Sequence, residues 1–110
     1  MLEVECHILI KNNNQVFIEQ TRIDLLLHIQ QTGSLRAASK KLGISYQHAW
    51  NMINEMNTLA DTPLVITQRG GASGGGASLT PSALRVIDEY QQINKQIKFF
   101  TKQINAEINM

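Results

Sequence analysis

Two glycines, Gly33 and Gly43, divide residues 21–62 into three short helical segments, and this division constrains the possible folds more than any other feature. Apolar residues recur every three or four positions in each segment, which is typical of amphipathic helices. Glycine readily adopts the left-handed conformation that follows many helix ends. The first helix is therefore expected at 21–32, with Thr21 as its N-cap.

Each of the next two helices is expected to begin after a serine. Ser34 and Ser45 can each accept a hydrogen bond from a free amide in the following turn, so we predict that both are N-caps. Ala38 lets the two helices approach closely, and Gly43 turns the chain between them. The pattern predicts a helix-turn-helix at 34–60 whose inward residues are Leu35, Ala38, Leu42, Ile44, Ala49, Ile53, Met56, Leu59 and Ala60.

Short apolar runs on either side of the three helices predict two β-hairpins. Residues 2–10 and 16–18, separated by a polar turn, predict an N-terminal hairpin at 1–18 in which Cys6 is a half-buried strand residue. Residues 64–66 and 77–79 predict a second hairpin at 64–79. Its tip, at 70–76, is mostly glycine.

The last part of the chain predicts one long helix at 81–109. Thr80 and Pro81 supply a capping hydroxyl and a proline at the first helical position. Apolar residues then follow a seam close to a heptad repeat, and nothing later in the chain could cover its distal half. We therefore expect a second copy of the chain to cover the seam, which makes a homodimer through Ile87, Tyr90, Ile93, Ile97, Phe100, Ile104 and Ile108.

The charge and composition limit the possible functions. Ten basic and nine acidic residues nearly cancel, so any affinity for nucleic acid must come from local clustering of charge. The acidic N-terminus does not resemble a secretion signal, and no apolar run reaches membrane-spanning length. We expect one domain at 1–110 that is cytoplasmic and does not bind membranes, and the single cysteine suits a reducing compartment.

The helix-turn-helix is locally basic and presents a polar face. No acidic residue lies between Gly33 and Asn54. At the start of the third helix, polar or amphipathic side chains could meet base edges, and we predict base readout by Ser45, Tyr46, Gln47, His48 and Asn51. Basic residues of the second helix are expected at the DNA backbone: Arg36, Lys40 and Lys41. Trp50, in contrast, is expected in the core.

The segments 32–38 (TGSLRAA), 42–46 (LGISY), 49–50 (AW) and 53–57 (INEMN) resemble the DNA-binding domain of ModE-type molybdate-responsive regulators. The glycine-rich run that leads to Leu79 and Thr80 resembles the wing of that family, and Pro63-Leu64 and 79–81 are also similar to the more distant LysR-type regulators. The resemblance covers roughly residues 20–95. It implies a mainly α, winged helix-turn-helix dimer of a transcriptional regulator, with the third helix in the major groove.

At the base of the wing, the resemblance implies that Gln68 and Arg69 reach phosphates or the minor groove. The glycine tip allows either close approach of the backbone to DNA or a mobile hairpin end. ModE-type proteins continue into molybdate-binding domains, whereas this chain ends at Met110. We therefore expect no direct molybdate sensing, whether the protein relies on a separate sensor or is part of a longer chain.

Other functions find less support in the sequence. The glycines are not followed by a Gly-Lys-Ser/Thr motif, the three histidines lack companions at ligand spacing, and no nucleophile has a matching base and acid. We expect no nucleotide, metal or other cofactor and no enzymatic activity. The alternative that remains is a winged-helix module that binds another protein and not DNA.

Overall fold

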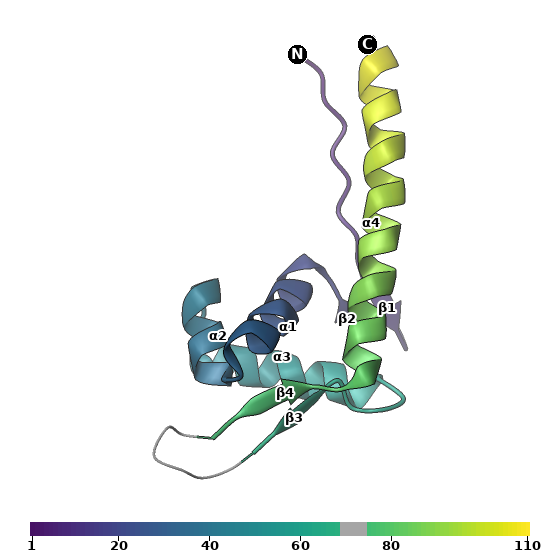
Figure 1. Ribbon diagram of the computed structural model, residues 1–110. Coiled ribbons are helices and arrows are strands. Elements are labelled where there is room, and N and C mark those ends of the chain that lie inside the picture. Colours follow the sequence, from purple (N-terminus) through teal and green to yellow (C-terminus); the bar gives the residue numbers. More distant parts are fainter. Residues whose placement is uncertain (69–74) are drawn as a thin grey trace.

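The computed structural model describes residues 1–68 and 75–110, and contains four helices and two small antiparallel hairpins in those ranges. In chain order the elements are β1 (Ile10–Asn12), β2 (Gln15–Ile18), α1 (Gln20–Thr32), α2 (Leu35–Leu42), α3 (Tyr46–Leu59), β3 (Val65–Thr67), β4 (Ala77–Leu79) and α4 (Pro81–Glu107). In Figure 1, α1, α2 and α3 form a cluster, and α4 projects away from it.

The ends of α1 and α2 and the starts of α2 and α3 are as the sequence predicts, whereas α3 ends at Leu59, before the predicted end of the three-helix core at residue 62. Gly33 and Gly43 have φ values of 68° and 75°, in the left-handed region where glycine lacks the steric penalty of other residues. Ser34 accepts a hydrogen bond from the amide of Ala37, and Ser45 accepts one from the amide of His48. The predicted N-cap of α1 is wrong: Glu19 occupies that position, because β2 ends at Ile18 and the helix starts at once.

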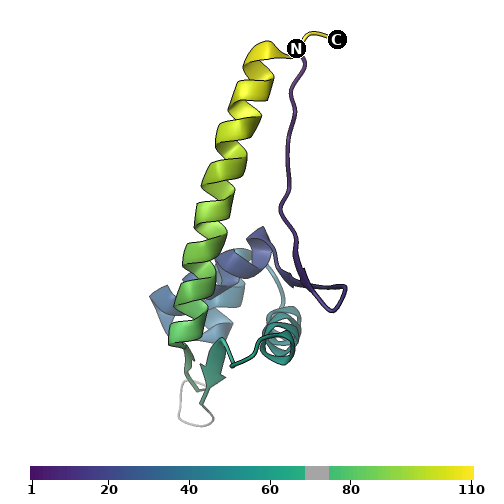
Figure 2. The same ribbon diagram turned by 90° about the vertical axis from the view of Figure 1, so that its right-hand side faces the viewer.

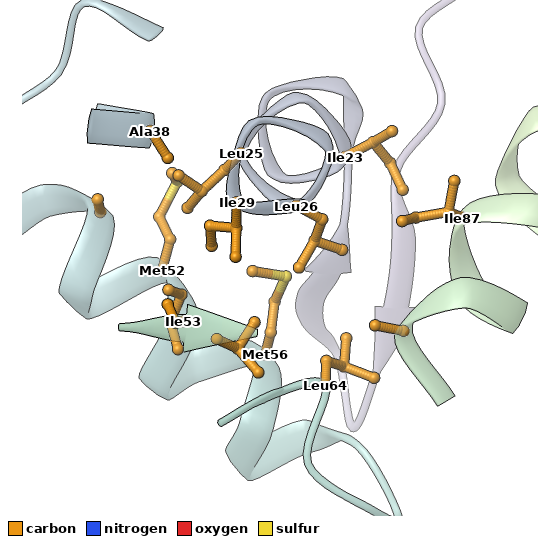
Figure 3. Packing of buried hydrophobic residues seen from close by; sticks show 14 of the residues in the cluster. Ile23, Leu25, Leu26, Ile29, Ala38, Met52, Ile53, Met56, Leu64 and Ile87 are labelled. Atoms are coloured by element: carbon orange, nitrogen blue, oxygen red, sulfur yellow. The ribbon is translucent and has the colours of Figure 1, made fainter. Parts of the chain in front are cut away.

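The core lies between α1 and α3. The wing, which is the hairpin of β3 and β4, and the first part of α4 also contribute buried side chains to it. Figure 3 shows Ile29 of α1 and Ile53 and Met56 of α3 pointing toward one another. These side chains are almost fully buried, and burial of each contributes roughly 1.5 to 3 kcal/mol. Trp50 is half-buried and packs against this cluster, as expected.

The N-terminal hairpin is shorter than predicted. Asn13 and Asn14 form its two-residue turn with positive φ values of 52° and 62°, which asparagine tolerates better than most residues. Because β2 has only four residues, the chain before Ile10 pairs with no strand within residues 1–68 and 75–110. The predicted strand at 2–10 is therefore wrong, and Cys6 is exposed rather than half-buried.

Residues before β1 instead run alongside α4 (Figures 1 and 2). The side chain of Asn105 accepts a hydrogen bond from the Val4 amide at 2.6 Å and donates one to the Val4 carbonyl at 3.1 Å. The side-chain amide thus replaces a neighbouring strand at this one residue. Among the described helices, none is long and apolar enough to cross a membrane.

Candidate nucleic-acid interface

The start of α3 presents a polar, exposed face. All five residues predicted to read bases are exposed: Ser45, Tyr46, Gln47, His48 and Asn51. The buried stripe of the same helix, which includes Ala49, Met52 and Ile53, fixes its rotation against the core. The polar face therefore points to solvent because the opposite face is held by packing.

Two of the five side chains interact with each other. The Gln47 Nε2 group donates to the Oδ1 atom of Asn51 at 2.9 Å, one helical turn away. Amide side chains of this kind can pair with adenine by a donor and an acceptor. The Ser45 hydroxyl is already used as the N-cap acceptor of α3.

The predicted phosphate-binding cations of α2 are also exposed. Lys40 and Lys41 lie in the last turn of α2, where positive charge also interacts favourably with the helix dipole. Arg36, near the other end of α2, places its guanidinium carbon 4.7 Å from the centroid of the Tyr46 ring. This stacking joins α2 to the first residue of α3.

The wing is attached to the helix-turn-helix through backbone hydrogen bonds. The Ala77 amide of β4 donates to the Gly33 carbonyl between α1 and α2 at 3.0 Å. Gln68 is exposed, and its backbone amide donates to Gly76 across the hairpin. Arg69 and most of the predicted glycine tip lie outside the described residues.

Asn57 also positions the wing, a role that was not predicted from the sequence. From the end of α3, its Oδ1 atom accepts hydrogen bonds from the Leu64 and Val65 amides at 2.8 and 3.2 Å, and its Nδ2 group donates to the Val65 carbonyl. These bonds tie the first wing strand to the helix that carries the polar face. Its sequence signals were a polar residue beside the buried stripe near a helix end and its place in the segment 53–57 that resembles ModE-type regulators.

The predicted dimer seam divides into two parts. Ile87 and Tyr90 are buried within the core of the chain itself, so they leave almost no surface for a partner. Farther along α4, Ile93, Phe100 and Ile104 are exposed, and Ile97 is half-buried. The helix ends at Glu107, two residues earlier than predicted, and the half-buried Ile108 is its C-cap.

The arrangement of a polar helix face, a packed corner and a wing agrees with comparisons to known proteins. Residues 21–84 match the model of bacterial regulatory helix-turn-helix proteins of the lysR family. The chain belongs to this LysR family. The match begins at the second residue of α1, includes α2, α3 and both wing strands, and ends in the first turn of α4.

Similar ModE-type proteins support the same assignment. The chain is 43% identical to the transcriptional regulator ModE of Yersinia pestis and 42% identical to the DNA-binding transcriptional dual regulator ModE of Escherichia coli K12, over 81% of its length in both cases. It is 39% identical over 78% of its length to the molybdenum-pterin-binding protein MopB of Rhodobacter capsulatus. The chain spans about a third of the length of these relatives.

Two solved structures share the fold. A LysR family transcriptional regulator superposes with a TM-score of 0.57 at 16% identity, over 79% of this chain and 28% of that one. A point mutant of ZitR from Lactococcus lactis superposes with the same TM-score at 18% identity, over 91% of this chain and 70% of that one. The predicted winged helix-turn-helix fold with a long C-terminal helix is therefore confirmed.

Proposed function

We propose that this protein is a transcriptional regulator that binds a specific DNA sequence as a homodimer in the cytoplasm, with α3 in the major groove. The main support for this function is the exposed polar face at the start of α3, which lies beside the exposed cations of α2. Amide side chains there suit base edges, while the cations suit phosphates. No carboxylate lies between Gly33 and Asn54 to oppose DNA binding.

The distal half of α4 supports the dimer. Beyond Tyr90 this helix leaves the core, and residues 3–7 lie along the side of it that carries Asn94, Thr101 and Asn105. Phe100 and Ile104 remain 60% and 47% exposed, which is unfavourable for two large apolar side chains on one helix. A second copy related by a two-fold axis covers this stripe and places two α3 helices for a pseudo-palindromic site.

The first experiment selects bound fragments from random duplex DNA. We expect an inverted repeat to be enriched, because two copies of α3 read two half-sites. Binding should weaken steeply as salt rises, with a slope of about −0.9 in log K against log salt for each phosphate contacted. Failure to enrich any sequence, together with salt-insensitive binding of a protein, would favour a protein-interaction module instead.

Two variants then separate readout from phosphate binding. We expect Gln47→Ala to cost about 1 to 3 kcal/mol on the selected site and little on a scrambled one. Lys40→Ala should weaken both DNAs similarly and reduce the salt slope by about one. Lys95→Ala, which removes an exposed charge from α4, is the matched control. Equal effects of Gln47→Ala and Lys40→Ala on every sequence contradict the roles assigned to them.

A further inference from the structure

Arg36 and Tyr46 form a stacked pair at the junction of the two helices of the helix-turn-helix. Arg36 is the second residue of α2, and Tyr46 is the first residue of α3. The 4.7 Å between the guanidinium carbon and the ring centroid is well inside the distance at which a cation is attracted to an aromatic face. Both residues are exposed, so the pair lies on the surface beside the polar face of α3.

In the part of the chain that the structure describes, the N–H groups of the Arg36 guanidinium are not engaged by another protein group. Within residues 1–68 and 75–110, the ion pairs join Arg22 to Glu55 and His7 to Glu5, and neither involves Arg36. No hydrogen bond from the Arg36 side chain to another described residue is present either. A guanidinium that stacks through its face keeps its N–H groups in the plane, where they can meet a phosphate in a bidentate pair.

The stack also limits what Tyr46 can do. The ring face under the guanidinium cannot contact a thymine methyl group or stack on a base. The ring does, however, hold a long, flexible side chain in one orientation. Less rotamer freedom is then lost when Arg36 binds a phosphate, so the ring increases affinity without touching DNA.

We propose that Tyr46 is a positioning residue that holds Arg36 for a contact with a DNA backbone phosphate. This inference rests on the proposed DNA binding, and it replaces the base-reading role that the sequence suggested for Tyr46. Base readout then belongs to the residues farther along the exposed face, Gln47, His48 and Asn51.

The stack itself is tested without DNA. The side-chain protons of Arg36 lie near the Tyr46 ring, so their NMR signals should be shifted upfield by the ring current. We expect Tyr46→Phe to keep this shift, because it keeps the ring, and Tyr46→Leu to abolish it. Thermal unfolding of each variant shows whether the fold is intact. An Arg36 signal that is the same in the wild type and in Tyr46→Leu overturns the proposal.

Binding to the selected DNA tests the function of the pair. Tyr46→Phe should bind like the wild type. Tyr46→Leu should bind about two- to fivefold more weakly, because this is the loss of affinity that corresponds to the free energy of an exposed cation–π contact. Arg36→Ala should reduce the salt slope by about 0.9, because one phosphate contact is lost. In the Arg36→Ala background, Tyr46→Leu should have no further effect. Arg36→Lys, which keeps the charge but not the plane, should respond to Tyr46→Leu less than the wild type does.

The outcomes distinguish this proposal from the function on which it rests. If Tyr46→Leu weakens binding equally with and without Arg36, or changes the selected sequence, Tyr46 reads bases directly and the positioning role is wrong. If the wild-type protein enriches no DNA sequence and shows no salt-dependent binding, both the DNA-binding function and the positioning role fail.

Discussion

The two halves of α4 have the same apolar spacing but different surroundings. In the first half, Ile87 and Tyr90 are 7% and 3% exposed, because α1 packs against this part of the helix. In the second half, Phe100 and Ile104 are 60% and 47% exposed, because the helix has passed the end of the core (Figure 2). The same periodicity therefore marks an internal contact in one half and, in our proposal, a contact with a second subunit in the other.

The largest effect is expected in the first half of α4. Ile87→Asp places a carboxylate where the wild type buries an apolar side chain, and we expect it to lower the free energy of unfolding by about 4 kcal/mol or more. Leu84→Asp is the control, because Leu84 is exposed on the same helix. Chemical denaturation measures both. Similar losses in the two variants would contradict the burial of Ile87 in the core, on which the difference between the two halves of α4 depends.

A second prediction concerns the second half of α4. Ile97→Asp should leave the subunit folded but raise the dissociation constant of the proposed dimer by about a hundredfold, because it places a charge within the apolar contact. Light scattering across a concentration series measures this change. The control is Gln91→Asp, an exposed position on another side of α4 by helical spacing. A dimer that is unchanged by Ile97→Asp argues against this interface.

A smaller effect on stability is expected at Tyr90, in the first half of α4. Its hydroxyl donates to the Gln20 Oε1 atom of α1 at 3.2 Å, so Tyr90→Phe should cost about 1 kcal/mol of stability. Burial raises the pKa of Tyr90 above its usual 10.0, and the carboxylates of Asp24 and Glu19 raise it further.

The raised pKa makes the effect of Tyr90 depend on pH. Above pH 10 the unfolded chain loses the phenol proton before the folded one, so the stability that Tyr90 contributes is present below pH 10 and decreases at higher pH. The difference in stability between the wild type and Tyr90→Phe should therefore shrink above pH 10. A difference that grows with pH would show that the folded protein favours the ionised tyrosine.

The smallest effect is expected at the far end of α4. Asn105→Ala removes both hydrogen bonds to Val4 and should lower the protection of the Val4 amide against hydrogen exchange by about fivefold. Global stability should change little, because Val4 itself is not one of the buried core residues. Gln103→Ala, at an exposed neighbouring position, is the control. Unchanged protection of Val4 means that Asn105 does not hold this segment in solution.

The sequence alone determined the helix-turn-helix, because its signals are local. A capping serine forms its hydrogen bond within three residues, and a glycine ends a helix through its own backbone. The polar face of α3 could be predicted for the same reason, since a buried stripe leaves only the opposite side exposed. The two-residue asparagine turn is likewise a local feature.

Only the tertiary structure decided which segments meet when they are far apart in the chain. The strand predicted at 2–10 failed because its pairing depends on the length of β2, and Val4 instead meets Asn105, 101 residues away. Asn57 with the wing, and Arg36 with Tyr46, are also contacts between separate elements. Periodicity shows which side of a helix is apolar, but what covers that side depends on how the whole chain packs in three dimensions.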